Sequence, residues 1–505
     1  MRLFLFACAL CLGFSVNAQV QDKIWVEFKD KKNSPYSIDK PEEFLSERAI
    51  ERRARYDIAI AENDLPVNPQ YLKRLESKGV KVHITSKWLN GAIVLGSKAQ
   101  IEDIKDLPFV HEVEVVGKHH PARAANKINS PMESKSDYKQ KPYEYGYAKN
   151  QIEQVNGQFL HERGLKGQGM IIAVLDGGFS KADVMPFFDS LRVNDRWIQG
   201  WDFVNNDNYP YEASSHGTQV MSTMGANLPG LMIGTAPEAT YVCVRTEEVG
   251  SELKVEEYNW VAGAEYADSL GADVINSSLG YTTFDRTSMN YKYKDLDGNT
   301  AIVTIGADFA ASKGLLVVTS AGNEGGDSWN YVGAPADAND ILSVGSVDKY
   351  GNPSFFSSYG PTADGRVKPN VSGTGSSTIV ASLYGYHTNY ADGTSYSSPV
   401  IAGIAASLWA AFPDKTNLEI IEALEKSSSL YDSPDVQMGY GIPDMEKAFN
   451  ILKESQEVVA SVNSLEGKSG ELSLSESQLS KSTEDKLKQL IRFLLSLRFE
   501  PENRP

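Results

Sequence analysis

Short apolar runs alternate with longer helical stretches from about residue 150 to residue 455. The runs predict β-strands at MIIAVL (170–175), TYVCV (240–244), ADVINSS (272–278), LLVVTS (315–320) and ILSVGS (341–346). Residues 254–270 and 300–314, which lie between these runs, have the apolar periodicity of helices. Near-continuous apolar strands separated by helices are typical of a mostly parallel sheet with helices on both faces. Residues 148–455 are therefore expected to form an α/β domain.

A smaller α+β unit is expected before this domain, over residues 19–118. Its alternating apolar patterns predict strands at 24–28, 80–85, 92–97 and 110–116, and helices at 41–56, 68–79 and 101–108. Residues 119–147 are polar and without periodicity, which is typical of an exposed linker that proteases can reach.

The two ends of the chain have their own patterns. Residues 3–16 are almost entirely apolar after Arg2, and Val16-Asn17-Ala18 fits a signal-peptidase site before Gln19. The run is shorter than the roughly 20 residues of a membrane-spanning helix, and no later segment is apolar enough to cross a membrane. Residues 1–18 are therefore expected to be a signal peptide, with a buried N-terminal helix as the alternative. The mature chain would be extracellular, or periplasmic if the cell has an outer membrane.

Residues 456–505 are expected to form a flexible tail that ends in an amphipathic helix. Its apolar positions at helical spacing are Leu487, Leu490, Ile491, Leu494 and Leu495. This helix would dock on its own protein or bind a partner.

Composition and charge narrow the picture further. The chain has 505 residues and three cysteines. Cys8 and Cys11 leave with the signal peptide, so Cys243 stays alone in an expected buried strand and no internal disulfide can form. A large core must then supply the stability. The net charge of −17 argues against nucleic acid or an anionic membrane as a partner.

Three residues of the types that serve nucleophilic catalysis lie at the end of a predicted strand or at the start of a predicted helix. Asp176 ends a strand before two glycines, at the sheet edge where ligand sites of open α/β sheets lie. His216 opens a helix after a polar loop, and Ser395 starts an apolar helix after Gly393. A serine hydroxyl needs a base that takes its proton, for which His216 is the candidate, with Asp176 to orient the imidazole.

A developing oxyanion needs donors beside the serine. The Ser395 amide at a helix N-terminus is one candidate, and the side chain of Asn323, just past a buried strand, is the other. Each of these residues taken alone would also fit an ordinary helix cap, turn or surface position.

The motifs around these residues resemble the subtilisin-like proteases. VLDGG, HGTQV, INSSLG, SAGNEG and GTSYSSP follow one another in the order of that family, and the Asp, His, Ser order is the one known for subtilisin. The resemblance covers about residues 150–455 and implies a serine endopeptidase. It also implies substrate-binding roles for Ser278, Leu279, Gly280, Ser320, Ala321, Gly322 and Gly333. A peptide-binding pseudoenzyme and a convergent lipase or esterase are the alternatives.

The family resemblance further implies that residues 19–118 are a prodomain that assists folding, inhibits the enzyme and is removed by self-cleavage. The linker at 119–147 departs from the usual direct junction, so the sequence does not give the processing site. The chemistry requires no cofactor. A structural calcium ion is not supported, because Gly306 stands where a loop starting at Asp295 would need a glutamate. Ala334-Pro335 is a candidate cis peptide bond.

Overall fold

The computed structural model describes residues 21–119 and 144–466. The expected signal peptide, most of the expected linker and the expected C-terminal amphipathic helix lie outside these residues. Within the described ranges, no helix is both long enough and apolar enough to cross a membrane.

Residues 21–119, called the N-terminal unit below, contain a four-stranded antiparallel sheet in the order β2-β3-β1-β4. Its elements are β1 (Gln21–Phe28), α1 (Glu47–Arg55), α2 (Pro69–Glu76), β2 (Lys81–Ser86), β3 (Gly91–Gly96), α3 (Lys98–Lys105) and β4 (Val110–His119). The prediction of a single helix over 41–56 is wrong in one respect. It is divided into a 3-10 turn, η1 (Pro41–Glu43), and α1, because the Ser46 hydroxyl accepts the Ala49 N–H and starts a new helix there.

The larger sheet has seven strands, and all neighbouring strands run parallel. In spatial order they are β13 (Val371–Thr374), β12 (Leu342–Val347), β11 (Leu316–Ser320), β10 (Val274–Ser277), β5 (Ile171–Asp176), β9 (Thr240–Arg245) and β6 (Trp197–Asp202). The predicted α/β fold with a mostly parallel sheet is confirmed. The edge strands β6 and β13 were not predicted, because one contains Gln199-Gly200 and the other is a short, partly polar VSGT segment.

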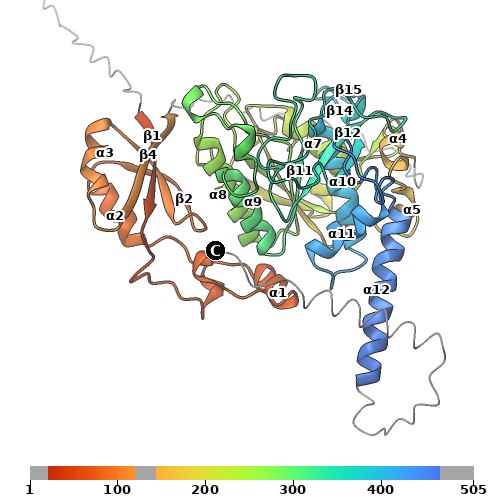
Figure 1. Cartoon of the computed structure of the whole chain (residues 1–505), viewed down its shortest axis with the longest axis horizontal. Helices are drawn as coiled ribbons and strands as arrows, with labels where there is room; N and C mark the ends of the chain where they lie inside the picture. Colours follow the sequence, from red (N-terminus) through yellow and green to blue (C-terminus); the bar gives the residue numbers. More distant parts are fainter. Residues whose placement is uncertain (1–20, 120–143, 467–505) are drawn as a thin grey trace, which may run out of the picture. The chain divides into compact units, whose positions relative to one another are not determined.

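Helices cover both faces of this sheet, as Figure 1 shows. Successive strand residues point to opposite faces, so Ile172 and Val174 join one apolar core and Ala173 and Leu175 the other. The first core contains α7 (His216–Gly225), α10 (Thr394–Trp409) and α11 (Asn417–Ser427), and the second contains α8 (Val255–Leu270) and α9 (Ile302–Ser312). Every residue of α10 is buried, as expected for a helix that is apolar all round.

The remaining elements are short, except for the last helix. They are α4 (Lys149–Glu153), α5 (Gln158–His161), η2 (Glu62–Asp64), η3 (Pro186–Phe188), α6 (Asp189–Val193), β7 (Asn227–Leu228), β8 (Met232–Ile233), η4 (Thr287–Met289), η5 (Tyr293–Asp295), β14 (Thr378–Ala381), β15 (Thr388–Ala391) and α12 (Met445–Glu466).

Two boundaries differ from those expected. Residues 144–147 were assigned to the linker, but Tyr145 is buried and Gly146 forms a β-bridge with Met232. Apolar burial of the Tyr145 ring against Ile152 therefore starts the packed domain earlier. The tail was expected to begin at residue 456, but α12 extends to Glu466, because neither proline nor glycine interrupts the sequence before residue 467.

The N-terminal unit is bound to α8 through buried charges. Glu265 accepts hydrogen bonds from the backbone N–H groups of Lys87, at 2.8 Å, and Trp88, at 3.0 Å. One turn on, the fully buried Asp268 pairs with Arg52 at 2.5 Å, Arg53 at 2.9 Å and Lys87 at 3.2 Å. Burial acts to raise the pKa of Asp268, but the three cations outweigh it and hold the pKa well below its ordinary value.

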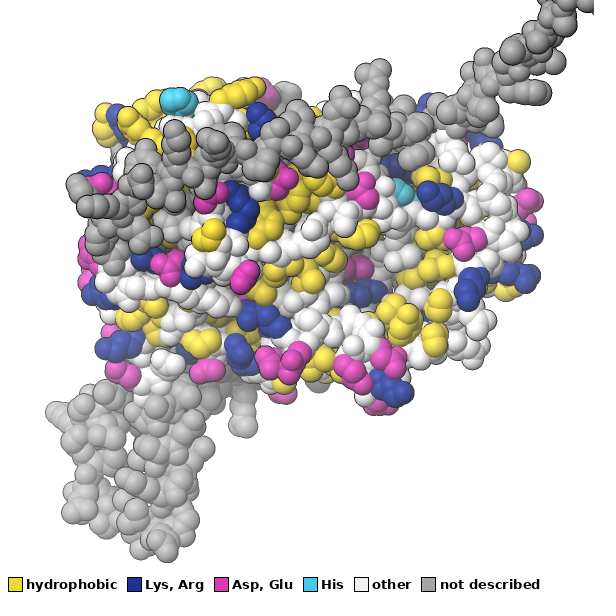
Figure 2. Space-filling view, turned by 180° about the vertical axis from the view of Figure 1, so that it is seen from behind, with side chains coloured by type: hydrophobic (Ala, Val, Ile, Leu, Met, Phe, Trp, Pro, Cys, Tyr) yellow, Lys and Arg dark blue, Asp and Glu magenta, His cyan; other side chains and the backbone are white. Residues whose placement is uncertain are grey.

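The surface mixes charges of both signs. On the face seen in Figure 2, acidic and basic side chains are interspersed with hydrophobic ones. The net charge of −17 is therefore not gathered into one acidic patch on that face.

Replacing Asp268 with asparagine should weaken the attachment of the N-terminal unit. The substitution keeps the shape but leaves Arg52, Arg53 and Lys87 without a buried anion, which costs roughly 3–5 kcal/mol. We expect the free energy of unfolding to fall by about this amount, measured with denaturant on a chain that also carries Ser395→Ala to prevent self-cleavage. The exposed Asp327→Asn should change it by less than about 0.5 kcal/mol. Equal effects of the two substitutions would contradict this.

Candidate active site

Asp176 is the last residue of β5 and has no exposed surface. Gly178 follows at φ 143°, and a Cβ there would lie 2.2 Å from the carbonyl oxygen of Glu212, so only glycine allows the chain to turn at this point. The Asp176 carboxylate also accepts the N–H of Gly177 at 2.8 Å. The turn and this hydrogen bond hold the carboxylate at the carboxyl edge of the sheet.

His216, the first residue of α7, faces this carboxylate. Both carboxylate oxygens of Asp176 lie 2.9 Å from His216 Nδ1. Because an ionised carboxylate only accepts hydrogen bonds, Nδ1 is the donor, and Nε2 of the neutral ring is left to accept a proton. The imidazole is partly exposed and lies beside the ring of Tyr396.

The charge of Asp176 sets the protonation of this histidine. Burial acts to lower the pKa of His216, but the charge of Asp176, its hydrogen bond to the ring and the charge of Glu247 outweigh burial. The pKa of His216 is therefore raised above its ordinary value of 6.5. The imidazolium is stabilised in this site, as a base that must hold a proton during a reaction requires.

Ser395 is the second residue of α10, so its backbone N–H lies in the first turn of a buried helix. Its hydroxyl donates to the carbonyl oxygen of Ser278 at 3.3 Å, and the Ser278 hydroxyl donates back to the Ser395 carbonyl at 2.9 Å. Among the described residues, this hydroxyl forms no hydrogen bond with His216.

Asn323 is held against the start of the same helix. Its side-chain oxygen accepts the backbone N–H of Thr394 at 2.9 Å and the Thr394 hydroxyl at 3.0 Å, which leaves the amide nitrogen as the outward group. A Cβ built on Gly393 would lie 3.7 Å from Asn323 Nδ2, from Asn323 Oδ1 and from the Ser395 nitrogen. The Asn323 amide and the Ser395 nitrogen therefore border the same small space beside Gly393.

The segments expected to bind substrate are also brought together. Ser278 and Leu279 are buried and Gly280 is exposed, directly after β10. Ser320 and Ala321 are buried at the end of β11, and the Ala321 carbonyl accepts the N–H of Gly333 at 3.1 Å. Gly322 follows at φ 111°. The Ala334-Pro335 bond is cis, as predicted, and Tyr281 donates its N–H to the Ala334 carbonyl at 2.8 Å.

A cleft of about 330 Å³ lies beside these groups and contains glutamates that the sequence analysis missed. Asp176, His216 and residues 278–280 line one part of it, and Glu247, Glu248 and Glu252 line the other. The signal was present in the acidic run TEEVGSELKVEE after β9, but nothing in the sequence indicated that this run faces the candidate site.

Comparison with known proteins identifies the family. Residues 167–441 match the Subtilase family, and residues 23–133 match the Peptidase S8 propeptide domain of Bacteroidota. The chain belongs to the subtilase family. It is a subtilisin-like serine peptidase with an N-terminal propeptide domain, and both parts of the predicted family resemblance are confirmed.

Individual relatives agree with this assignment. The subtilase is 31% identical to Subtilisin NAT of Bacillus subtilis subsp. natto over 380 residues, which are 74% of this chain and 84% of the relative. It is 33% identical to a subtilisin of Bacillus pumilus over 303 residues, which are 59% of this chain and 97% of the relative. Among solved structures, fervidolysin of Fervidobacterium pennivorans shares the fold, with a TM-score of 0.57 at 21% identity, covering 86% of this chain and 62% of that one.

The titration of His216 in this subtilase should depend on Asp176. Asp176→Asn removes the charge that outweighs burial, so the pKa of His216 should fall from above 6.5 to below it. The midpoint is measurable by NMR of the ring C–H groups in a chain with Ser395→Ala. Burial lowers the pKa of His161 to about 4, and its titration should be the same in both chains. An unchanged His216 midpoint would show that Asp176 does not set it.

Proposed function

We propose that this subtilase is an endopeptidase that hydrolyses peptide bonds through Ser395, His216 and Asp176. The observation that carries the proposal is the contact of both Asp176 oxygens with His216 Nδ1, at 2.9 Å, beside the N-terminus of the helix that bears Ser395. The family assignment supports the reaction class.

In the proposed reaction, the Ser395 hydroxyl turns from Ser278 toward His216 and attacks the carbonyl carbon of the scissile bond. His216 Nε2 takes the hydroxyl proton and later gives it to the leaving amine, while the carboxylate of Asp176 stabilises the imidazolium. The raised pKa of His216 supports this role. Water then attacks the acyl-enzyme with the same histidine as base, which releases the acid and restores Ser395.

The oxyanion of each tetrahedral intermediate would lie in the space beside Gly393. The Ser395 backbone N–H and the Asn323 side-chain amide would donate to it, and both nitrogens border that space at 3.7 Å from a built Cβ. Because the Asn323 oxygen accepts from Thr394, the nitrogen of the same amide is left free to donate to the oxyanion while these hydrogen bonds are kept.

The proposed substrate is an extended peptide, with Ser278, Leu279 and Gly280 as its strand partner. Gly280 is exposed, which leaves its backbone accessible to a pairing strand. Residues 320–322 and Gly333 would form the opposite wall and the floor of the pocket for the side chain before the scissile bond. No cofactor is proposed. The Asp295 carboxylate accepts the backbone N–H of Lys292, and the Asp297 carboxylate accepts that of Asn299, which supports a surface turn.

The proposed enzyme is made as an exported zymogen. Residues 1–18 have the pattern of a signal peptide, although they lie outside the described residues. The propeptide match and the buried ion network around Asp268 support an N-terminal unit that remains bound as an inhibitor until self-cleavage in the segment after it.

Ser395→Ala should abolish both peptidase activity and self-shortening. Loss of the nucleophile in such a triad costs on the order of 10⁴ to 10⁶ in kcat, a range known from subtilisin. Wild-type chains should lose roughly the first 120 to 147 residues, whereas the variant should keep the length left by signal removal. A radiolabelled sulfonyl fluoride should label Ser395 in the wild type alone. Activity is measured separately, with casein and with a simple ester as substrates.

The outcomes separate the alternatives. Turnover of the ester without casein would indicate an esterase, and peptide binding without labelling would indicate a pseudoenzyme. Near-normal turnover by the variant would contradict the assignment of Ser395. Purified wild type that begins at Gln19 and is fully active would contradict the inhibitor role.

Asn323→Ala should lower kcat by about 10²–10³, the magnitude known for this change in subtilisin, with little change in KM. The reason is that the oxyanion forms only in the transition state. Steady-state kinetics on a chromogenic peptide measure both constants. An increase in KM alone would mean that Asn323 binds the ground-state substrate instead.

A further inference from the structure

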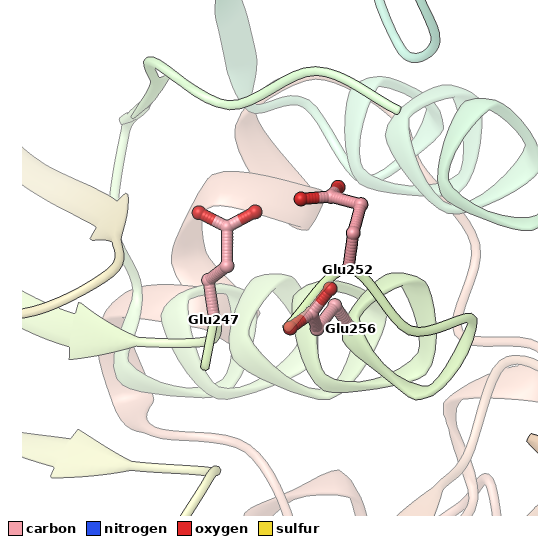
Figure 3. Close-up of side chains that lie close together, drawn as sticks. All are labelled: Glu247, Glu252 and Glu256. Atoms are coloured by element: carbon pink, nitrogen blue, oxygen red, sulfur yellow. The ribbon is translucent and has the colours of Figure 1, made fainter. Parts of the chain in front are cut away.

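The loop between β9 and α8 brings three glutamates together. One oxygen from each carboxylate of Glu247, Glu252 and Glu256 lies within 4.8 Å of the others, and the side chains point into the same space (Figure 3). Glu256 is fully buried in the first turn of α8 and accepts the N–H groups of Leu253 at 2.9 Å and Glu248 at 3.2 Å. It therefore fixes the loop that carries the other two carboxylates.

This group, called the glutamate cluster below, faces the substrate cleft. Glu247 and Glu252 line the same cleft as His216 and residues 278–280. Because residues 278–280 form the proposed strand partner of the peptide, a peptide bound there would pass beside the glutamate cluster.

The carboxylates are costly to keep charged when the cleft is empty. Burial first, and then the charges of neighbouring carboxylates, raise the pKa of Glu247 to about 8, of Glu252 to about 7 and of Glu256 to about 9. Among the described residues, none of the three forms an ion pair. A cation brought into the cluster would take the place of the protons and stabilise the charged forms.

A buried hydroxyl borders the same region without a partner. Tyr281 has no exposed surface, and its hydroxyl makes no hydrogen bond to any described residue. Tyr281 follows Gly280, which lines the cleft, and burial and then the charges of Glu247, Glu256 and Glu252 raise the pKa of its phenol. The Tyr281 hydroxyl is thus a buried polar group to which no described residue forms a hydrogen bond.

Strand β4 of the N-terminal unit reaches this region. A Cβ built on Gly117 of β4 would lie 3.1 Å from Val255 and 3.5 Å from Leu253, next to Glu252 and Glu256 in the sequence. Lys23, the strand partner of Gly117, is buried, and burial lowers the pKa of its ammonium although the charges of Glu248 and Glu256 act to raise it. From there the sequence continues as Lys118-His119-His120-Pro121-Ala122-Arg123. The described part of β4 thus contacts the chain segment between Glu252 and Glu256.

We infer that Glu247 and Glu252, held in place by Glu256, form a subsite that selects a lysine or arginine side chain of the peptide substrate, before the scissile bond. This inference rests on the proposed peptidase function. A long aliphatic stem lets such a side chain reach the cluster while the substrate backbone stays on residues 278–280.

The test uses the processed wild-type enzyme and matched peptides. The peptides of one set differ at a single position, which holds lysine, methionine or glutamate; methionine is similar in size to lysine but has no charge. The position tested is the second, third or fourth residue before the scissile bond, with one set for each. We expect kcat/KM for lysine to exceed that for methionine by about tenfold or more at one position, and glutamate to be the poorest.

Variants then assign this selectivity to the cluster. Glu252→Gln and Glu247→Gln should each lower the lysine-to-methionine ratio severalfold, and Glu252→Lys should invert the preference toward glutamate. The ratio is the readout because Glu247 also acts on the pKa of His216. The matched control is Glu422→Gln, an exposed residue of α11 that is absent from the cleft lining, and it should leave the ratio unchanged.

Other results would overturn the inference in distinguishable ways. If wild type cleaves lysine and methionine peptides equally well, the subsite is wrong and the peptidase function stands. The subsite is also wrong if the Gln variants cleave the lysine and the methionine peptides more slowly by the same factor. If millimolar Ca²⁺ raises the melting temperature of wild type but not of Glu252→Gln, and removes the lysine preference, the cluster is a cation site instead. If no peptide is cleaved and Ser395 is not labelled, the proposed function fails, and this inference with it.

Discussion

The shared edge of the parallel sheet is the constraint on which the whole site depends. Because the strands all run in one direction, the carboxyl ends of β5, β10 and β11 lie side by side. Asp176 is the last residue of β5, Ser278 follows β10 directly, and Asn323 lies three residues past the end of β11. The buried helix α10 packs on the same strands and brings Ser395 to this edge through hydrogen bonds with Ser278. Each group is held by a strand end or a helix start, where rigid elements fix geometry better than loops do.

The carboxylates around the cleft illustrate two solutions to the cost of a buried charge. Asp176 is fully buried, but the N–H of Gly177 and the imidazole of His216 satisfy it, so it can remain an anion that holds the base. Glu247 and Glu252 have no such partners among the described residues and share their space with Glu256, and their pKa values are raised. The first arrangement suits a permanent catalytic orienting group. The second suits a group completed by its ligand.

The sequence was sufficient where local pattern and chemistry coincide. Apolar runs gave the central strands, and the glycines beside Asp176 and Ser395 marked positions where a backbone turn or an open space is needed, as at Gly178 and Gly393. It was insufficient where an element is defined by its neighbours. β13 becomes a strand only because β12 offers a parallel partner, and Glu247 and Glu252 meet only because the loop after β9 closes over Glu256. The roles of the candidate site residues remain predictions.

The two attachments of the N-terminal unit differ in what self-cleavage can do to them. A cut in the segment after His119 removes the covalent link, and with it the high effective concentration that a tether provides. It does not touch Asp268, whose pairs with Arg52 and Arg53 lie on α8 and α1, away from the junction in the sequence. On the proposed function, the cut unit therefore stays bound through its buried charges. Full activity then requires that the Asp268 network also be broken or the unit be degraded.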